Sequence, residues 1–395
     1  MKTSFHTLHL KKLLLTFTAV GLLHTSPLIV SSAQAAADSS STSPQPVKVS
    51  AGLESYSLLD NEGHVWIIGK RVPTRVKGLE NVSDFAFNGR GLAAREDGTV
   101  WEWSYQYNSP EDTTWYFPVT SPVQIPQLKN IVKVAENAQQ LNAALDKEGT
   151  VWVWNTKHSL EKREEKAPVP IPGLKKVKGI TVFNGQVIAL QEDGTVFSST
   201  GFDDYTYNFS ANWNLQIHEN TSYNIRTKQV PGLSDIVELG KGTNTRHLLA
   251  LKKDGTVMAW GDNHYGQLIG KHGDAEPIEA VQVPGLTDII SLTSGNTHSL
   301  ALKKDATVWE WGYLTIDGSH DFEHITTPVQ VKGLDHITAI SSGFGFNTAI
   351  GQDGTLWAWG ANNFEQLSDD TNTPKFSPVH VSFPKPRWML DLPKN

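Results

Sequence analysis

The chain has 395 residues, of which 38% are hydrophobic and 19% are charged, a composition typical of a globular protein that can bury a large core. It contains no cysteine, so disulfides are excluded and its stability must come from packing. The formal net charge of −7 argues against nucleic acid as a partner, because phosphate backbones attract Lys and Arg.

The N-terminal segment has the pattern of an export signal. Three lysines precede an apolar run over residues 13–23, and a small-x-small cleavage site follows at residues 33–35. We therefore predict a secretory signal peptide over residues 1–35, the alternative being a buried N-terminal helix. Its removal takes away three Lys and no acid, which changes the formal charge from −7 to −10. The apolar run is too short to span a bilayer comfortably, and no other segment approaches a membrane span.

Residues 36–46 are rich in Ala, Ser, Thr and Pro, which predicts a flexible leader. The chain that follows repeats one unit, an Asp-Gly or Glu-Gly turn followed by a strand that carries Trp. Asp-Gly between apolar runs indicates a tight hairpin. The turn positions of the seven copies are Gly63, Gly98, Gly149, Gly194, Gly255, Ala306 and Gly354. Ala306 predicts a strained turn or a different turn type. Ten of the thirteen Trp residues lie in this unit, so we interpret Trp as mainly architectural.

Each repeat supplies four short antiparallel strands. A strand that ends in Gly precedes the hairpin, as at residues 289–295 in the sixth repeat. A Pro-bounded strand follows the hairpin, as at residues 281–286 in the fifth repeat. In the hairpin's second strand Trp309 and Trp311 share one face and Val308 occupies the other, which suits a sheet packed between two others. We predict an all-β fold, a seven-bladed β-propeller of four-stranded antiparallel blades over residues 47–395, with a C-terminal tail from about residue 382. An open β-solenoid or two β-sandwiches are the alternatives.

Two stretches carry a family resemblance. Gly295 to Leu302 leads into Asp305 to Gly312, and Asp254 to Gly261 continues through Asp262 to Leu268. This pattern resembles the regulator of chromosome condensation repeat family, whose members form seven-bladed propellers. The resemblance covers nearly all of residues 47–381 and is most specific in the last three repeats.

The resemblance implies a class of function. Bacterial members of the family are often exported and act by binding proteins, and one similar protein inhibits β-lactamases through the rim of its propeller. Nuclear members exchange nucleotide on a small GTPase, an activity that we do not carry over to a chain predicted to be exported and acidic. The family's His before the second strand survives only as His247 and His298. We expect both to pack and to form hydrogen bonds within their blades.

The sequence shows no catalytic signature. The acidic pairs at residues 164–165, 203–204 and 369–370 are adjacent loop acids, whereas paired carboxylate catalysis requires two groups held about 5–10 Å apart. There is no phosphate-binding loop and no nucleophile elbow, and the histidines in loops share no spacing typical of metal ligands. We therefore predict no enzyme, no catalytic residue, no cofactor and no metal.

The repeats differ most in the link that follows the Trp strand. It is long in repeats two and four, at residues 104–121 and 198–229, and equivalent loops of a propeller emerge on one face. The aromatic residues that we predict to contact a partner are Tyr105, Tyr107, Trp115, Tyr116, Phe117, Phe202, Tyr205, Tyr207, Trp213 and Tyr223. Rigid aromatics on loops resemble protein-binding hot spots, although compact loops can also bury their own aromatics.

These observations lead to one functional hypothesis. We predict a secreted, monomeric, non-enzymatic propeller, extracellular or attached to the cell surface, whose aromatic rim loops bind an unknown protein as an inhibitor or adaptor. One alternative is a module that binds cell-wall or other polysaccharide through the same aromatics. A further alternative is a propeller enzyme with its site at the central pore.

Overall fold

The computed structural model describes residues 44–69, 73–104, 119–137, 141–155, 167–202, 205–209, 215–219, 223–242, 245–269, 280–313, 325–381 and 383. The predicted signal peptide and nearly all of the predicted leader lie outside these ranges. No helix occurs in the described part of the chain, and therefore none there is long and apolar enough to cross a membrane.

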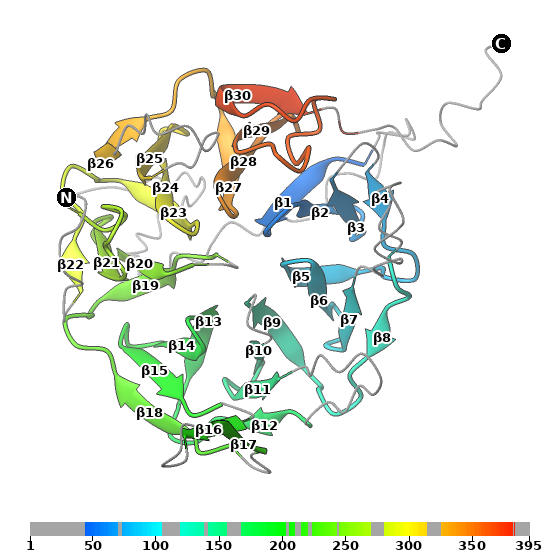
Figure 1. Cartoon of the computed structure of the whole chain (residues 1–395), viewed down its shortest axis with the longest axis vertical. Helices are drawn as coiled ribbons and strands as arrows, with labels where there is room; N and C mark the ends of the chain where they lie inside the picture. Colours follow the sequence, from blue (N-terminus) through cyan, green and yellow to red (C-terminus); the bar gives the residue numbers. More distant parts are fainter. Residues whose placement is uncertain are drawn as a thin grey trace, which may run out of the picture. The chain divides into compact units, whose positions relative to one another are not determined.

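Seven four-stranded antiparallel sheets surround a central axis (Figure 1), and each is built from consecutive main strands. Blade 1 contains β1 (Pro46–Ala51), β2 (Tyr56–Asp60), β3 (Val65–Ile68) and β4 (Thr74–Arg75). Blade 2 contains β5 (Val82–Phe87), β6 (Arg90–Arg95), β7 (Val100–Ser104) and β8 (Val123–Gln124). Blade 3 contains β9 (Ile131–Glu136), β10 (Leu141–Asp146), β11 (Val151–Asn155) and β12 (Val169–Pro170).

The remaining blades follow the same order. Blade 4 contains β13 (Val177–Phe183), β14 (Gln186–Gln191), β15 (Val196–Thr200) and β18 (Arg226–Gln229), and an extra hairpin of β16 (Tyr205–Phe209) and β17 (Leu215–Glu219) precedes β18. Blade 5 contains β19 (Ile236–Leu239), β20 (His247–Lys252), β21 (Val257–Gly261) and β22 (Val281–Gln282). Blade 6 contains β23 (Ile289–Ser294), β24 (His298–Lys303), β25 (Val308–Gly312) and β26 (Ile325–Gln330). Blade 7 contains β27 (Ile337–Ser342), β28 (Phe346–Gly351), β29 (Leu356–Gly360) and β30 (Lys375–Val381). The predicted propeller is confirmed, whereas the β16–β17 hairpin was not predicted.

The hairpin turns keep the same conformation in all seven blades. The six turn glycines have φ between 78° and 84°, and Ala306 has φ of 65°. Glycine adopts this left-handed conformation without a Cβ clash, whereas alanine is strained in it. The first of the two outcomes predicted for Ala306, a strained turn, is therefore the observed one.

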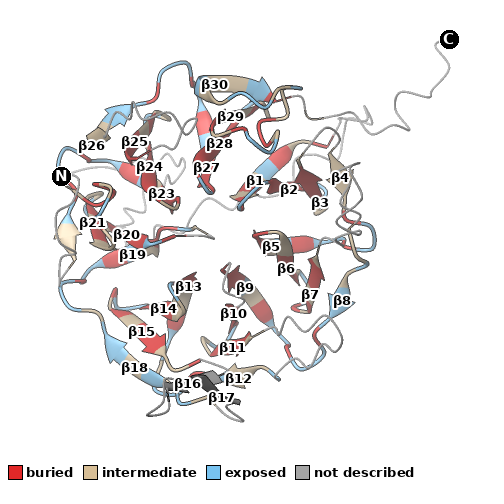
Figure 2. Cartoon of the chain, viewed as in Figure 1, coloured by how far each residue is buried: buried red, intermediate tan, exposed pale blue. Residues whose placement is uncertain are grey.

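A sheet with two apolar faces needs another sheet against each face. The hydrophobic core is therefore divided into clusters that lie between neighbouring blades. Seven buried hydrophobic clusters occur in the described residues, each formed by two neighbouring blades. In blade 6, Trp311 belongs with Trp309 to the cluster shared with blade 5, while Val308 belongs to the cluster shared with blade 7. The predicted alternation of this strand is therefore confirmed, and Figure 2 shows the buried residues spread around the whole ring.

The innermost strand of each blade has a free edge towards the pore, and neighbouring blades satisfy part of it. The backbone N–H of Phe87 donates to the Ser50 hydroxyl at 3.2 Å, and the N–H of Ser342 donates to the Thr293 hydroxyl at 3.2 Å. Each hydroxyl belongs to the preceding blade. These bonds supply partners for backbone groups that the sheet itself leaves unpaired.

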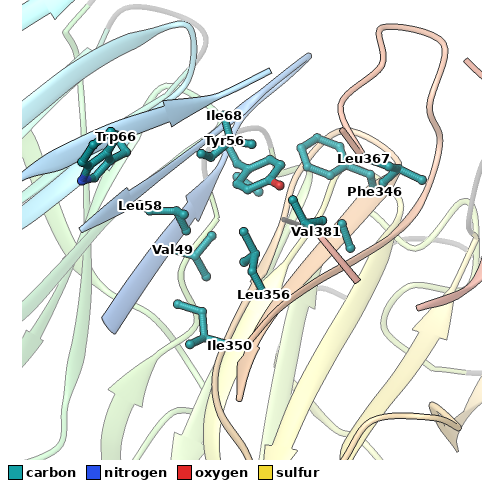
Figure 3. Packing of buried hydrophobic residues seen from close by; sticks show 12 residues of the cluster. Val49, Tyr56, Leu58, Trp66, Ile68, Phe346, Ile350, Leu356, Leu367 and Val381 are labelled. Carbon is teal, nitrogen blue, oxygen red and sulfur yellow. The ribbon is translucent and has the colours of Figure 1, made fainter. Parts of the chain in front are cut away.

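The ring closes where blade 7 meets blade 1. The Ala51 N–H donates to the hydroxyl of Ser341 at 2.9 Å, and the rings of Tyr56 and Phe346 lie 6.1 Å apart between centroids. Figure 3 shows these rings among the buried aliphatic side chains of both blades. Because every blade is built from its own consecutive strands, closure rests on side-chain packing and on hydrogen bonds between the two blades, and not on an exchanged strand.

Removing the buried ring of Phe346 should destabilise this closure. Phe346→Ala leaves a cavity in a fully buried position, a change that costs about 3–5 kcal/mol. Urea denaturation followed by Trp fluorescence should show a clearly lower midpoint. Phe376→Ala is the control, because Phe376 is 72% exposed and should change stability by less than about 0.5 kcal/mol. Equal midpoints for Phe346→Ala and the wild type would contradict closure by packing.

Candidate binding face and its polar seams

The antiparallel order of each blade places two links at the same end of the sheet. The link from first to second strand and the link from third to fourth strand share one end, while the Asp-Gly turns lie at the other. We call the first end the loop face. The links that follow β7 and β15 leave their sheets at the loop face. Residues 105–118 of the first link lie outside the described residues.

The predicted contact residues divide into three groups. Tyr105, Tyr107, Trp115, Tyr116, Phe117 and Trp213 lie outside the described residues. Tyr205 and Tyr207 lie on β16, of which only the backbone pairing with β17 is described. Phe202 and Tyr223 flank this hairpin and are described with their side chains.

Phe202 and Tyr223 anchor the base of the loop against blade 3. Phe202 is 3% exposed and meets the ring of Tyr223 edge-on, with centroids 6.1 Å apart. The Tyr223 hydroxyl accepts a hydrogen bond of 2.9 Å from the backbone N–H of Asn155. Both side chains therefore have a packing role that fixes where the β16–β17 hairpin leaves the blade.

The loop face also presents two aromatics that were not predicted as contact residues. Tyr265 and Phe364 occupy equivalent positions in the loops after β21 and β29, two residues after a buried Asn and two before a buried Gln. In the blade 7 loop the Asn362 side chain accepts the N–H of Leu367 at 2.9 Å, and the Gln366 side chain accepts the N–H of Phe364 at 2.9 Å. The buried amides thus hold the loop in one shape with the aromatic residue at its tip.

Adjoining loops of blades 7 and 1 carry exposed apolar side chains on this face. Phe344 is 46% exposed, and Leu53 and Phe364 are each 38% exposed. The N–H of Phe344 donates to the Gly52 carbonyl at 3.1 Å, and the N–H of Ala361 donates to the Gly345 carbonyl at 2.8 Å. These bonds join the three loops that carry the side chains. We call Leu53, Phe344 and Phe364 the loop-face patch.

The two family histidines connect blades and are fully buried. The Nε2 of His247 lies 2.7 Å from the hydroxyl of Ser299, and the Nε2 of His298 lies 2.7 Å from the side-chain amide of Asn347. Ser299 and Asn347 each belong to the following blade. The prediction of hydrogen bonds within the blade was therefore wrong, because the second strand of one blade faces the second strand of the next.

A different polar group fills the seam between blades 2 and 3. The guanidinium of Arg90, in the histidine slot of blade 2, donates to the buried Glu102 carboxylate at 3.3 Å. Glu136 is buried beside them. Burial raises the pKa of Glu136 to about 8, with the Arg90 charge opposing this change. Glu136 is therefore largely protonated at neutral pH, although nothing in the sequence distinguishes it from a surface glutamate.

The pore holds charged residues at equivalent positions of the innermost strands. Lys48, Asp84, Lys133 and Glu238 each occupy the third position, just after the bulge that shifts the register in each blade. Lys48 forms an ion pair with the Oδ1 of Asp84, while the Oδ2 of Asp84 accepts the N–H of Val134 at 2.9 Å.

The ionisation of the pore groups is consistent with a structural role. Burial alone would raise the pKa of Asp84, but the ammonium groups of Lys48 and Lys241 and its hydrogen bonds hold it below the usual value. Burial lowers the pKa of Lys48 and raises that of Glu238. Since both oxygens of Asp84 are engaged, the pair links blades 1, 2 and 3 and leaves Asp84 poorly placed for proton transfer.

The buried histidines predict a loss of stability in acid. Burial lowers the pKa of His247 to about 3 and that of His298 to about 4. Both imidazoles are neutral in the fold, so their contribution is fully present above the unfolded pKa of about 6.5 and is lost as the pH falls towards the folded values. By about pH 4.5 the loss should be roughly 2–3 kcal/mol per imidazole. Melting temperatures of wild type and His247→Gln/His298→Gln should converge between about pH 7 and pH 4.5, and a constant difference would contradict the prediction.

Glu136 predicts the opposite trend. Its raised pKa means that the folded state retains a proton which the unfolded state releases above about pH 4.5, so stability falls as the pH rises towards about 8. Glu136→Gln should therefore melt near the wild-type temperature at about pH 4.5 and above it at about pH 8.5. Glu96→Gln, at an exposed position, is the control and should follow the wild type at both values. An advantage of Glu136→Gln that does not grow with pH would contradict the assignment.

Comparisons with known proteins agree with this architecture. A family model described as "Regulator of chromosome condensation (RCC1) repeat" matches residues 244–267 and 337–366, and a second model of that description matches residues 353–390. Protein pim1 of Schizosaccharomyces pombe is 26% identical over 240 residues, which are 52% of this chain and 42% of pim1. The human E3 ubiquitin-protein ligase HERC2 is 28% identical over 293 residues, 67% of this chain and 6% of HERC2. The chain thus spans less than half the length of these relatives.

A solved structure shows the same fold. The yeast RCC1 protein Prp20, in its complex with Kap60, superimposes with a TM-score of 0.61 at 18% identity, over 87% of this chain and 84% of that one. At this identity the likeness concerns the fold alone. The predicted resemblance is confirmed: the chain is a seven-bladed β-propeller that carries regulator of chromosome condensation repeats, matched in its fifth and seventh blades.

Proposed function

We propose that this chain is an exported, non-enzymatic propeller that binds a partner protein through its loop face. The loop-face patch is the observation that carries the proposal. Three large apolar side chains from adjoining loops are exposed on one side of a fold whose other large side chains mostly fill the seams. Exposed apolar groups that gather on a rigid scaffold are typical of interaction sites.

Further observations support a protein as the partner. The buried Asn and Gln side chains fix the loops that carry Tyr265 and Phe364, and such preorganisation reduces the entropy cost of binding. We expect the predicted aromatic loops at 104–121 and 198–229 to extend from the same face. A yeast protein that contains the same fold, Prp20, was solved bound to another protein, Kap60, which is in line with a protein as the partner.

The non-enzymatic and exported parts of the proposal have separate support. Asp84 is committed to Lys48 and Val134, and the family histidines are engaged between blades, which gives these groups structural roles. Export rests on the charge and apolar pattern of residues 1–35. An inhibitor or adaptor of an extracellular protein fits both.

The test is capture of partners from the culture medium and cell surface by the mature chain. We expect one protein to be retained in stoichiometric amount, and Phe344→Ser with Phe364→Ser to weaken its binding at least about tenfold, since hot-spot residues contribute about 1–2 kcal/mol or more each. Trp115→Ala with Trp213→Ala tests the predicted loops in the same assay.

Phe376→Ser is the matched control, because Phe376 is an exposed aromatic on the outer strand β30 and lies outside the loop-face patch. It should bind like the wild type. Retention on purified wall polysaccharide without any protein would replace the proposal by the carbohydrate alternative. Equal effects of the Phe376 and Phe344 changes would show that the loop-face patch is not the binding site.

A further inference from the structure

The hairpin turn of blade 1 brings together two carboxylates and an imidazole. Asp60 ends β2, Glu62 lies in the turn, and His64 directly precedes β3. The Nδ1 of His64 lies 3.2 Å from the Oδ2 of Asp60 and 3.5 Å from the Oε2 of Glu62. One ligand atom from each side chain lies within 4.8 Å of the other two.

These distances fit the coordination geometry of a small divalent cation. Zinc–nitrogen and zinc–oxygen bonds of about 2.0–2.2 Å in a tetrahedron place neighbouring ligand atoms roughly 3.3–3.6 Å apart. The observed separations of 3.2 and 3.5 Å are close to this range. A hydrogen bond from the imidazole to Asp60 would explain the first contact, but a single N–H directed at Asp60 does not explain why Glu62 approaches the same nitrogen.

Asp60 is held in place as a ligand would be. Its side chain is buried, and its Oδ1 accepts the backbone N–H groups of Glu62 at 2.9 Å and His64 at 2.8 Å. Its Oδ2 accepts the indole N–H of Trp66 at 2.7 Å. Hydrogen bonds of this kind orient metal-binding carboxylates in proteins. The side chains of Glu62 and His64 retain 51% and 16% of their exposure, so an ion can reach them from solution.

Blade 3 supplies an internal comparison. Asp146 and Glu148 occupy the positions of Asp60 and Glu62, and Thr150 occupies the position of His64. The Oδ1 of Asp146 accepts the N–H of Thr150 at 2.7 Å, and its Oδ2 accepts the indole N–H of Trp152 at 3.0 Å. The Asp–Trp arrangement therefore serves the hairpin without an imidazole, and His64 is what blade 1 adds to it.

We propose that Asp60, Glu62 and His64 bind one divalent first-row cation, with zinc as the best match. An imidazole nitrogen with two carboxylate oxygens is a donor set that zinc accepts. Three protein ligands leave a fourth position for water. No metal was predicted from the sequence, where the histidines in loops share no spacing typical of metal ligands and these three residues were not considered. The proposal stands independently of partner binding at the loop face.

The test measures metal uptake by the folded mature chain after treatment with a chelator. Equilibrium dialysis against Zn²⁺ should give one equivalent per chain, and Co²⁺ should give the visible absorption of a site with nitrogen and oxygen ligands. His64→Thr, which copies blade 3, should weaken zinc binding at least about tenfold, and Glu62→Gln should weaken it as well. Trp66→Phe removes one bond to Asp60 and should weaken binding by about 10–100-fold.

Thr150→His provides a gain-of-function control. It places an imidazole beside Asp146 and Glu148 and should raise the uptake to two equivalents. Circular dichroism of each metal-free variant should match the wild type, and so should the melting temperatures of Glu62→Gln, His64→Thr and Thr150→His, which separates loss of a ligand from loss of the fold. Trp66 is buried in the core, so the fold of Trp66→Phe is checked by its circular dichroism. Absence of zinc uptake by the wild type, or unchanged uptake by His64→Thr, would overturn the proposal.

Discussion

The structure depends on one constraint, which is that no blade can by itself bury both of its apolar faces and pair all of its backbone groups. Each sheet is apolar on both faces, and its innermost strand leaves an edge of backbone groups without ladder partners. Both needs are met only across a seam, where a cluster of hydrophobic side chains is shared and a hydroxyl of one blade accepts an N–H of the next. A ring gives every blade two neighbours, so it is the arrangement in which no seam is left exposed.

The same constraint explains which features could be predicted from the sequence. Turns and strand faces are local, and Asp-Gly followed by alternating apolar residues predicts them even where Ala306 replaces glycine at φ of 65°. Contacts across a seam depend on how two blades meet, which no single repeat encodes. His247 was therefore assigned to its own blade, although its partner is Ser299 in the next one. Glu136 was missed for the same reason, because only burial between two blades distinguishes it.

At the candidate binding face, too, some features could be predicted from the sequence and others could not. Loop length and aromatic content directed attention to residues 104–121 and 198–229, yet Phe202 is used to anchor its loop. Apart from Phe376 on β30, the exposed aromatics that the structure describes lie in loops where the sequence appeared merely repetitive. Gln366 and Asn362 are buried and hold their loop rigid, so the repeated polar residues have a structural role and the variable residue between them, Phe364, is available for recognition. In this fold the repeated residues hold the loops in shape, and the residues that differ between repeats at the loop tips determine which partner is recognised.

A similar division applies to the hairpin turns at the opposite end. In blades 2, 6 and 7 the indole N–H of the first Trp donates to the turn threonine, as Trp309 does to Thr307 at 3.1 Å. In blades 1 and 3 an aspartate at the end of the second strand accepts the indole instead. That substitution removes the need for a hydroxyl in the turn, because the indole already has its partner. Position 64 therefore does not need to supply a hydroxyl that accepts the indole N–H. A residue with a different side chain can occupy it without destabilising the blade. A histidine placed there, beside a carboxylate that the fold already orients, turns a structural motif into a set of ligands.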